Sequence, residues 1–388
     1  MKFILKTLSY ILVATLAALA TMVMMPEKQV IQVQESEKIS NLLSLIEQYY
    51  IAEADPVAME DGAAAGIVDG LEDRWSYYIP ASDYQAYQEQ SQNAYVGVGI
   101  TIVIREDGSG IDITKVEPNG PAARSGILPG DVLIAADGQP VLENGLDKTR
   151  DLVKGEEGTT VELTVLRDGK EMTFTVTREQ VQVAVTDAVL LEGHVGLISI
   201  YNFDARCADE TISSIQEMIS QGADSLIFDV RFNPGGYKHE LVAVLDFLLP
   251  EGELFRAENY DGSMEVDYSD KRSLDIPMAV LVNGDSYSAA EFFAAALDEY
   301  EAAVIVGEQT SGKGYFQQTF QLGDGSAVAL STGRYTTPNG VSLEGVGITP
   351  DVIVEVEPEL AGRIYSGLVP PEADPQIIAA INALKSGN

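Results

Sequence analysis

The sequence predicts a mixed architecture, in which an N-terminal helical region precedes a β module and an α/β core with a mainly parallel sheet. Three observations predict it. Apolar residues follow helical spacing between residues 39 and 71. From Tyr95 the chain changes to short β-like runs that glycine and proline separate. From about Val181 apolar strands alternate with amphipathic helices.

Composition excludes several classes of function. The formal net charge is −36, and a surface this acidic repels nucleic acid and anionic lipid headgroups, so we expect no nucleic-acid partner. Cys207 is the only cysteine, which rules out an internal disulfide and a cysteine-based metal site. The two histidines, His194 and His239, would have to share a zinc site with carboxylates. We therefore expect neither a metal nor another cofactor.

Residues 1–26 form a candidate membrane segment. Two lysines precede an uncharged run from Thr7 to Met25, which is close to the ~20 residues that span a bilayer as a helix. The basic flank should stay in the cytoplasm, which places the rest of the chain outside. We expect a single-pass signal anchor in the cell membrane. Cleavage after Ala18-Leu19-Ala20, giving a secreted protein, is the alternative.

Residues 27–94 form a polar linker and the helical region. The expected helices are Ile39–Tyr50, Pro56–Leu71 and Ser82–Gln90. Between the last two lies a loop rich in aromatic residues, Asp73–Tyr78, whose Trp75 is more typical of a packing anchor than of a ligand contact. The helices at 39–71 would either pair two subunits in a homodimer or pack on their own core.

The β module covers residues 95–180. Its expected strands are Val96–Ile104, Gly110–Val116, Asp131–Ala135, Thr160–Arg167 and Glu171–Thr177. Asp168-Gly169 is a strong hairpin turn between the last two of them. Two short helices fit between the strands, near Pro121–Ser125 and Gly145–Val153.

Four segments of this module resemble a PDZ domain in the circular order that bacterial proteases use. They are Gly97-Val98-Gly99-Ile100, Gly120–Ile127, Pro129–Leu133 and Asp137–Val141. The resemblance implies that a peptide adds as a strand beside Val98–Ile102, with its terminal carboxylate on backbone N–H groups near Gly97, Val98, Gly99 and Ile100. The alternative is a β module whose glycines only form turns.

The α/β core covers residues 181–357, and residues 358–388 form a C-terminal segment. Its expected strands and helices alternate: Val195–Ile200, Ala208–Gln221, Ser225–Arg231, Glu240–Leu249, Pro277–Val282, Ser288–Tyr300 and Ala303–Val306. Ser326–Ser331 and Gly333–Tyr335 add later strand material.

Ser288 is a candidate nucleophile, because an apolar strand, the turn Asn283-Gly284-Asp285 and a helix surround it. A serine at the start of a helix is otherwise a cap. A base for Ser288 could be His194, His239 or Lys313. Lys313 stands between glycines in Thr310–Gly314 and would act only if burial kept it neutral. Its alternative role is that of a surface charge.

Several segments resemble the C-terminal processing (tail-specific) peptidases, which are serine proteases with an inserted PDZ domain. They are Phe228–Gly236, Ser286–Glu291, Gly307–Gly314, Tyr335–Gly340 and Gly345–Asp351. The resemblance runs from about residue 39 to 357. It implies that Ser288 is the nucleophile, that Lys313 is its general base and that Gln317 orients the lysine. It also implies an oxyanion hole of backbone N–H groups from Gly235, Gly236 and Ala289.

The chain departs from the family pattern at four positions. Tyr287 replaces a small alanine beside the nucleophile, Ala290 replaces a serine, and Ser311 replaces a phenylalanine near the base. Lys154 stands where an arginine is usual, which puts a transfer of PDZ-dependent regulation in doubt. None of these changes removes a catalytic group.

The expected function is that of an extracytoplasmic serine endopeptidase. It captures C-terminal tails of proteins or peptides through its PDZ domain and cleaves through an acyl-enzyme. One alternative is a non-catalytic PDZ adaptor on a degenerate protease fold. Another is a protease with a Ser-His pair that uses His239.

Overall fold

The computed structural model describes residues 37–105 and 108–386. The chain divides into two compact units, Met1–Ala63 and Ala64–Asn388. The expected membrane anchor at residues 1–26 lies outside the described residues. Within the described part of the chain, no helix combines the length and the apolar character needed to cross a bilayer.

The first unit contains α2 (Glu37–Tyr49) and the first turns of α3 (Pro56–Asp69). The sequence predicts both helices, α2 from the spacing of its apolar residues and α3 from its many alanines. No residue of α2 is buried, and Leu42 and Leu43 on it are 52% and 43% exposed. An amphipathic helix with an uncovered apolar side is typical of a surface that another element or molecule covers.

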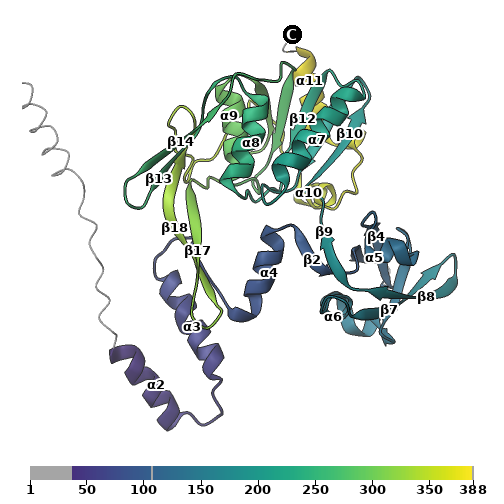
Figure 1. Ribbon diagram of the computed structural model, residues 1–388, viewed down its shortest axis with the longest axis vertical. Helices are drawn as coiled ribbons and strands as arrows, with labels where there is room; N and C mark the ends of the chain where they lie inside the picture. Colours follow the sequence, from purple (N-terminus) through teal and green to yellow (C-terminus); the bar gives the residue numbers. More distant parts are fainter. Residues whose placement is uncertain (1–36, 106–107, 387–388) are drawn as a thin grey trace, which may run out of the picture. The chain divides into compact units, whose positions relative to one another are not determined.

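The main sheet of the second unit is mostly parallel, as predicted (Figure 1). In spatial order its strands are β10 (Thr186–Leu191), β11 (Val195–Ile200), β12 (Ser225–Asp229), β15 (Met278–Val282), β16 (Ala303–Gly307) and β19 (Val352–Ile353). Only the pairing of β10 with β11 is antiparallel. All five side chains of β15 are buried, because helices cover a parallel sheet on both faces.

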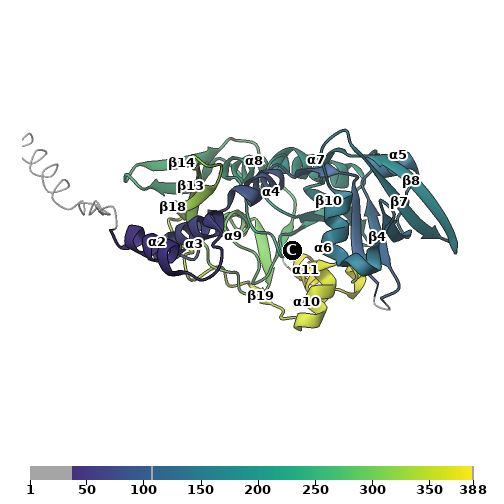
Figure 2. The same cartoon turned by 90° about the horizontal axis from the view of Figure 1, so that it is seen from below.

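The two faces of β15 belong to different layers. Met278, Val280 and Val282 pack in the cluster that contains α7 (Cys207–Ser220), α8 (Lys238–Leu248) and α9 (Ala289–Glu299). Ala279 and Leu281 pack in the cluster that contains α11 (Pro375–Ser386). Figure 2 shows α11 and α7 on opposite sides of the sheet. The alternation of side chains along a strand thus builds a helix–sheet–helix core.

A second, antiparallel sheet adjoins this core. Its strands are β1 (Tyr77–Ile79), β13 (Gly252–Asn259), β14 (Met264–Ser269), β17 (Tyr315–Gln321) and β18 (Ala327–Thr336). The sequence predicts β18 as two pieces and does not predict β13, β14 or β17. Strand β1 joins the sheet by pairing Tyr77–Ile79 with β18, which ties the segment after α3 to the rest of the second unit.

The PDZ module has its own apolar core and its own sheet. The sheet runs in the order β3 (Ile100–Ile104), β4 (Ile111–Val116), β5 (Val132–Ala136), β7 (Thr160–Arg167) and β8 (Lys170–Thr177), with β6 (Gln139–Pro140) beside β5. Its helices are α5 (Pro121–Ser125) and α6 (Val141–Val153). Gly99, at φ +78°, interrupts the predicted strand Val96–Ile104. The strand therefore divides into β2 (Ala94–Gly97) and β3.

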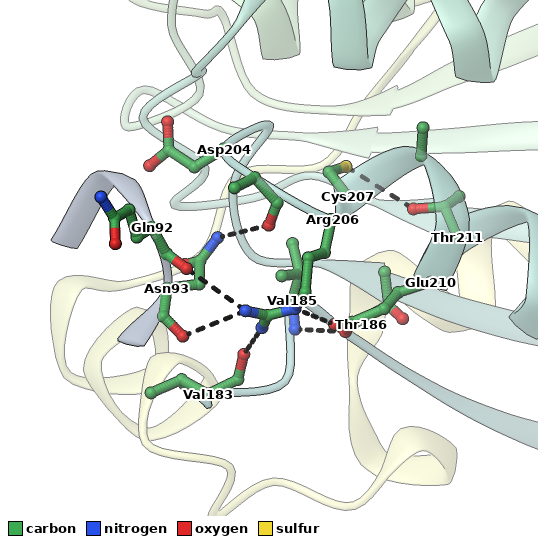
Figure 3. A network of polar contacts seen from close by, with 12 residues as sticks. Gln92, Asn93, Val183, Val185, Thr186, Asp204, Arg206, Cys207, Glu210 and Thr211 are labelled. Carbon is green, nitrogen blue, oxygen red and sulfur yellow. Dashed lines mark hydrogen bonds and ion pairs between the residues drawn. The ribbon is translucent and has the colours of Figure 1, made fainter. Parts of the chain in front are cut away.

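Strands β2 and β9 (Glu179–Gln182) lead into and out of the PDZ module and pair with each other. Arg206, at the start of α7, fixes both connections (Figure 3). Its guanidinium donates to the carbonyl oxygens of Gln92 and Val183, and its Nε donates to Glu210 at 2.9 Å. One side chain of the protease core thereby holds the chain on both sides of the module.

The remaining helices are α4 (Ala81–Ser91), α10 (Pro358–Tyr365) and the 3₁₀ turn Pro371–Ala373.

The C-terminal segment is anchored by a buried ion pair. Arg231 Nη1 donates to Asp374 at 2.9 Å and to Gln376 at 2.8 Å, while its Nη2 donates to Asp229 at 2.6 Å. Burial opposes the charge of Arg231, but the two carboxylates outweigh burial and raise its pKa. This pair braces the end of β12.

Candidate active site

Ser288 lies at a sharp turn between β15 and α9. Its backbone has φ 57° and ψ −125°, a conformation that is strained for a residue with a side chain. The turn before it is held by Ser286, which donates to Val230 O at 2.7 Å and accepts the N–H of Asn283 at 3.0 Å. Helix α9 starts at the next residue, so its N-terminal N–H groups face the region of the serine. The structure therefore has the strand, turn, serine and helix that the sequence predicts.

Glu291 connects the serine turn to the lysine loop. Its carboxylate is fully buried and accepts four hydrogen bonds. Oε2 accepts the backbone N–H of Ser288 at 3.0 Å and of Lys313 at 2.8 Å. Oε1 accepts the hydroxyl of Thr310 at 2.5 Å and the N–H of Gly312 at 2.7 Å. Burial raises the pKa of Glu291, and the hydrogen bonds oppose that rise.

Lys313 carries the lowered pKa that a lysine base needs. Desolvation by burial lowers the pKa of Lys313 to about 8, against the opposing attraction of Asp73, Glu291 and Glu344. Its Nζ lies 4.9 Å from the ring centroid of Trp75 and 5.7 Å from that of Tyr287. The environment thus makes Lys313 a titratable group near neutral pH rather than a permanent cation.

The structure brings Ser288 and Lys313 together through their backbones. Both N–H groups reach the same carboxylate oxygen of Glu291. Among residues 37–105 and 108–386, no hydrogen bond joins Ser288 Oγ to Lys313 Nζ. Catalytic hydrogen bonds are often long before a substrate binds, so this arrangement is compatible with proton transfer between the two groups.

The turn Gly235-Gly236 lies directly against the serine. A Cβ on Gly235 would stand 2.7 Å from Ser288 Cβ and 2.9 Å from the nitrogen of Ala289. The N–H of Gly235 already donates to Asn233 Oδ1 at 2.8 Å. In the described part of the chain no hydrogen bond uses the N–H of Gly236 or of Ala289. These two groups are therefore the ones available to an oxyanion.

Gln317 lies on β17, and its hydrogen bonds connect it to Asp73 rather than to Lys313. Its Nε2 donates to Ser331 Oγ at 3.0 Å and to Tyr315 O at 3.3 Å, and the structure gives it no hydrogen bond to Lys313. The N–H of Ser331 donates to Ser76 Oγ, which in turn donates to Asp73 at 2.6 Å. Gln317 thus belongs to a polar chain that ends at a carboxylate beside Lys313.

The two histidines contact residues other than Ser288. His194 Nδ1 lies 3.0 Å from Gly222 O. The side chain of His239 is 74% exposed, stacks on Tyr237 and lies 3.6 Å from Glu240. Neither has a contact with Ser288 in the described residues. Nor do those residues contain a cluster of three or more histidine, cysteine or acidic side chains that is arranged to hold a metal.

The PDZ module contains a cavity of about 630 Å³ beside the edge strand β3. Its apolar lining comes from Val98, Ile100, Ile102, Leu146 and Val153. Arg150 and Lys154 of its rim are basic, and Glu89 and Gln90 of α4 also face it. An unpaired strand edge next to an apolar groove is the geometry that accepts a peptide as an added strand. The predicted residues Val98 and Ile100 line this groove, whereas Gly97 pairs in β2 and Gly99 forms the bend between the strands.

Sequence reasoning missed the contribution of Asp73–Ser76 to the site. It identified this segment as a loop and Trp75 as a packing anchor. The segment lies more than two hundred residues before Lys313, and tertiary contacts bring the two together, among them the pairing of β1 with β18 and the hydrogen bonds from Arg74 to Ser311 O and Gly312 O. Glu291 stood inside a recognised motif, but its role in joining Ser288 to Lys313 depends on contacts that no local pattern encodes.

Comparison with known proteins gives two family matches. Residues 194–354 match the model of peptidase family S41, and residues 96–177 match that of the PDZ domain. The chain is 30% identical over 322 residues to a protein of Staphylococcus aureus (strain N315) named "Probable CtpA-like serine protease", covering 82% of this chain and 64% of that one. The match thus spans less than two thirds of the staphylococcal protein.

Two further comparisons agree. The carboxy-terminal processing protease CtpA of Bacillus subtilis (strain 168) is 29% identical over 332 residues, covering 85% of this chain and 71% of that one. A solved structure from Bacteroides fragilis, described as an S41 protease candidate, has a TM-score of 0.56 at 16% identity, covering 89% of this chain and 97% of its own. The last comparison concerns the fold alone. The chain thus contains a region that matches peptidase family S41 and a region that matches the PDZ domain, and it is similar to C-terminal processing serine proteases.

Proposed function

We propose that this chain is an extracytoplasmic endopeptidase that cleaves with a Ser288–Lys313 dyad. The observation that carries the proposal is the oxygen of Glu291 that accepts the N–H groups of both residues, at 3.0 and 2.8 Å. A buried carboxylate that fixes the serine turn to the lysine loop supports their action as a pair. The pKa of Lys313, about 8, supports its role as a base, because a base must be neutral at the working pH.

In this mechanism Ser288 Oγ attacks the scissile carbonyl carbon while Lys313 Nζ takes the hydroxyl proton. The carbonyl oxygen becomes an oxyanion that the N–H groups of Gly236 and Ala289 would bind. As the tetrahedral intermediate collapses, the Lys313 ammonium gives the proton to the leaving amine and an acyl-enzyme remains. Lys313 then activates a water molecule, which releases the acyl group and regenerates Ser288.

Replacing Ser288 by alanine is expected to abolish cleavage of an unfolded protein such as casein, because the nucleophile is gone. Ser286→Ala is the matched control. It removes the hydroxyl that donates to Val230 O, so it should lower stability but keep measurable cleavage and acylation of Ser288. Mass spectrometry of the trapped acyl-enzyme identifies the modified serine. Wild-type cleavage by Ser288→Ala would disprove the dyad.

We further propose that the PDZ groove captures the C-terminal tail of a protein or peptide substrate. The support is the open edge of β3 beside an apolar cavity with Arg150 and Lys154 on its rim. An apolar terminal side chain would fill the cavity and the basic rim would attract the tail carboxylate. The Lys154 ammonium lies 5.5 Å from the ring centroid of Tyr95, a second residue of the lining.

Reversing the rim charge with Arg150→Glu and Lys154→Glu is expected to weaken binding of a free-tail peptide roughly tenfold, the effect of losing about 1.4 kcal/mol of attraction. Binding of the same peptide with an amidated C-terminus should change far less. Lys170→Glu, at the exposed first residue of β8 outside the cavity, is the control. Fluorescence anisotropy measures both affinities. Equal losses for the free and amidated peptides would contradict carboxylate recognition at this rim.

The location outside the cytoplasm rests on the uncharged run Thr7–Met25 and its lysine flank, which would anchor the chain in the cell membrane. The exposed apolar side chains of α2, among them Leu42 and Leu43, support pairing of two copies through the first unit.

A further inference from the structure

We propose that the segment Asp73–Ser76, here called the base clamp, positions the side chain of Lys313. Trp75 of the clamp and Tyr287 of the serine turn form two walls around Nζ, and Asp73 of the clamp is the counter-charge for the ammonium. The inference rests on the proposed function of Lys313 as the base. Trp75 and Asp73 are positioning residues, since their effect on the reaction passes through Lys313.

The clamp holds the lysine loop on both sides of Lys313. On one side Arg74 Nη2 donates to the carbonyl oxygens of Ser311 and Gly312 at 3.2 and 3.0 Å. On the other side the N–H of Gly314 donates to Glu344 at 2.7 Å, and the same carboxylate accepts Trp75 Nε1 at 3.3 Å. The backbone before and after Lys313 is therefore tied to one short segment.

The ring of Trp75, together with that of Tyr287, controls the surroundings of Nζ. The rings of Trp75 and Tyr287 stack with centroids 6.1 Å apart and an interplanar angle of 28°. Nζ lies 4.9 Å from the first centroid and 5.7 Å from the second. Aromatic walls exclude water, which favours the neutral amine, while their faces attract the ammonium. Exclusion of water is the larger effect at Lys313, because its pKa is lowered overall.

Four charged groups face Lys313, and two of them, Asp73 and Arg74, come from the base clamp. Asp73, Glu291 and Glu344 favour the ammonium, and Arg74 opposes it. Burial would raise the pKa of Asp73, but hydrogen bonds from Ser331, Ser76 and the N–H of Trp75 lower it overall, so the carboxylate stays ionised. When Lys313 takes the proton of Ser288, an ionised Asp73 stabilises the new ammonium, as a carboxylate stabilises an imidazolium in other serine proteases.

Trp75 is the only tryptophan of the chain, so its emission reports directly on the clamp. In Ser288→Ala, which has no nucleophile, the emission of the full chain should change in one step with a midpoint at the pKa of Lys313, about 8. Lys313→Met should abolish that step, because the methionine fills a similar volume without a charge. The same titration in both variants would overturn the proposal.

The pH profile of kcat/KM separates positioning from a merely structural role. The acidic limb of this profile is the pH range in which kcat/KM rises as Lys313 becomes neutral. Trp75→Ala admits water to Nζ, so this limb should move to higher pH by about one unit. Asp73→Asn removes a group that favours the ammonium, so the limb should move to lower pH while kcat falls. Trp75→Phe keeps a ring over Nζ and should leave the limb near its wild-type position. Movement in opposite directions is the signature of control over the base.

Glu72→Gln is the matched control, since this exposed neighbour of Asp73 has no contact with the lysine loop in the described residues. Circular dichroism checks the fold of each variant, and Asp73→Asn keeps the test decisive if Trp75→Ala does not fold. Unmoved limbs in both Trp75→Ala and Asp73→Asn would overturn the proposal. The emission step does not depend on cleavage, so it distinguishes a wrong clamp from a wrong dyad.

Discussion

Lys313→Met is expected to lower kcat/KM by about 10⁴-fold or more, because removal of the base from a serine nucleophile leaves only binding and the oxyanion donors. In the wild-type protein kcat/KM should rise with pH along a limb centred at the pKa of Lys313, about 8, since only the neutral amine accepts the proton of Ser288. Cleavage of a peptide of fixed sequence, measured across the limb, checks both results.

Lys313→Met should lower kcat/KM but raise the stability of the folded chain. The pKa of Lys313 is lowered to about 8 in the folded chain from an ordinary value of 10.5. Below pH 8 the buried ammonium destabilises the folded state in full, and this penalty disappears as the pH rises toward 10.5. Lys313→Met removes the penalty at every pH. Its melting temperature at neutral pH should therefore exceed that of the wild type, by about 2–4 °C for each kcal/mol recovered.

The exposed Lys170 supplies the control for both measurements, because Lys170→Met removes a charge outside the site. It should leave kcat/KM and the melting temperature nearly unchanged. If Lys313→Met retained wild-type cleavage, Lys313 would not be the base, and a gain in stability alone would mark it as a buried charge without a role in the reaction.

Glu291→Gln is expected to cost about 3 kcal/mol of folding free energy, the scale of breaking a buried charge network. It should also lower kcat/KM by about 10²-fold, the effect of misplacing reacting groups by roughly an ångström. Each oxygen of Glu291 accepts two donors, so an amide NH₂ at either position faces N–H or O–H groups that it cannot accept. The serine turn and the lysine loop then lose their common partner.

Two variants test this explanation. Thr310→Val removes one of the four donors and should have a smaller effect on kcat/KM than Glu291→Gln. Glu301→Gln, at an exposed position just after the same helix, should have none. Urea unfolding gives the free energies. A full loss of stability with normal kcat/KM would show that Glu291 supports the fold without aligning Ser288 and Lys313.

The parts of the site that the sequence predicts are those encoded locally. An apolar run, a turn and a helix start make Ser288 a candidate nucleophile, and flanking glycines make Lys313 a candidate base. The resemblance of the surrounding motifs to the C-terminal processing peptidases selects these two residues over the alternatives. The strands β14 and β17 escaped prediction because most of their side chains are exposed or partly buried, with no strict alternation, and many are polar. Their pairing partners, not their composition, make them strands.

Contacts between distant segments could not be predicted at all. The sequence around Trp75 predicts a packing residue. Its further role follows only from the 4.9 Å distance between its ring centroid and Lys313 Nζ. Gly235 was expected to offer its N–H to an oxyanion, yet the side chain of Asn233 two residues earlier already uses it. Which donors stay free depends on the complete hydrogen-bond arrangement of the turn.

The pairing of β2 with β9 makes the PDZ module an insertion into a single two-stranded ribbon. Ala94 lies opposite Gln182 and Gly97 opposite Glu179, so the chain leaves the protease core and returns to it at one place. The entropy of closing such a loop grows only with the logarithm of its length, by about 0.6 kcal/mol for each doubling. The stability of the core thus depends only weakly on the length of the inserted segment. In evolutionary terms, the whole module can be replaced while the chemistry of the core stays as it is.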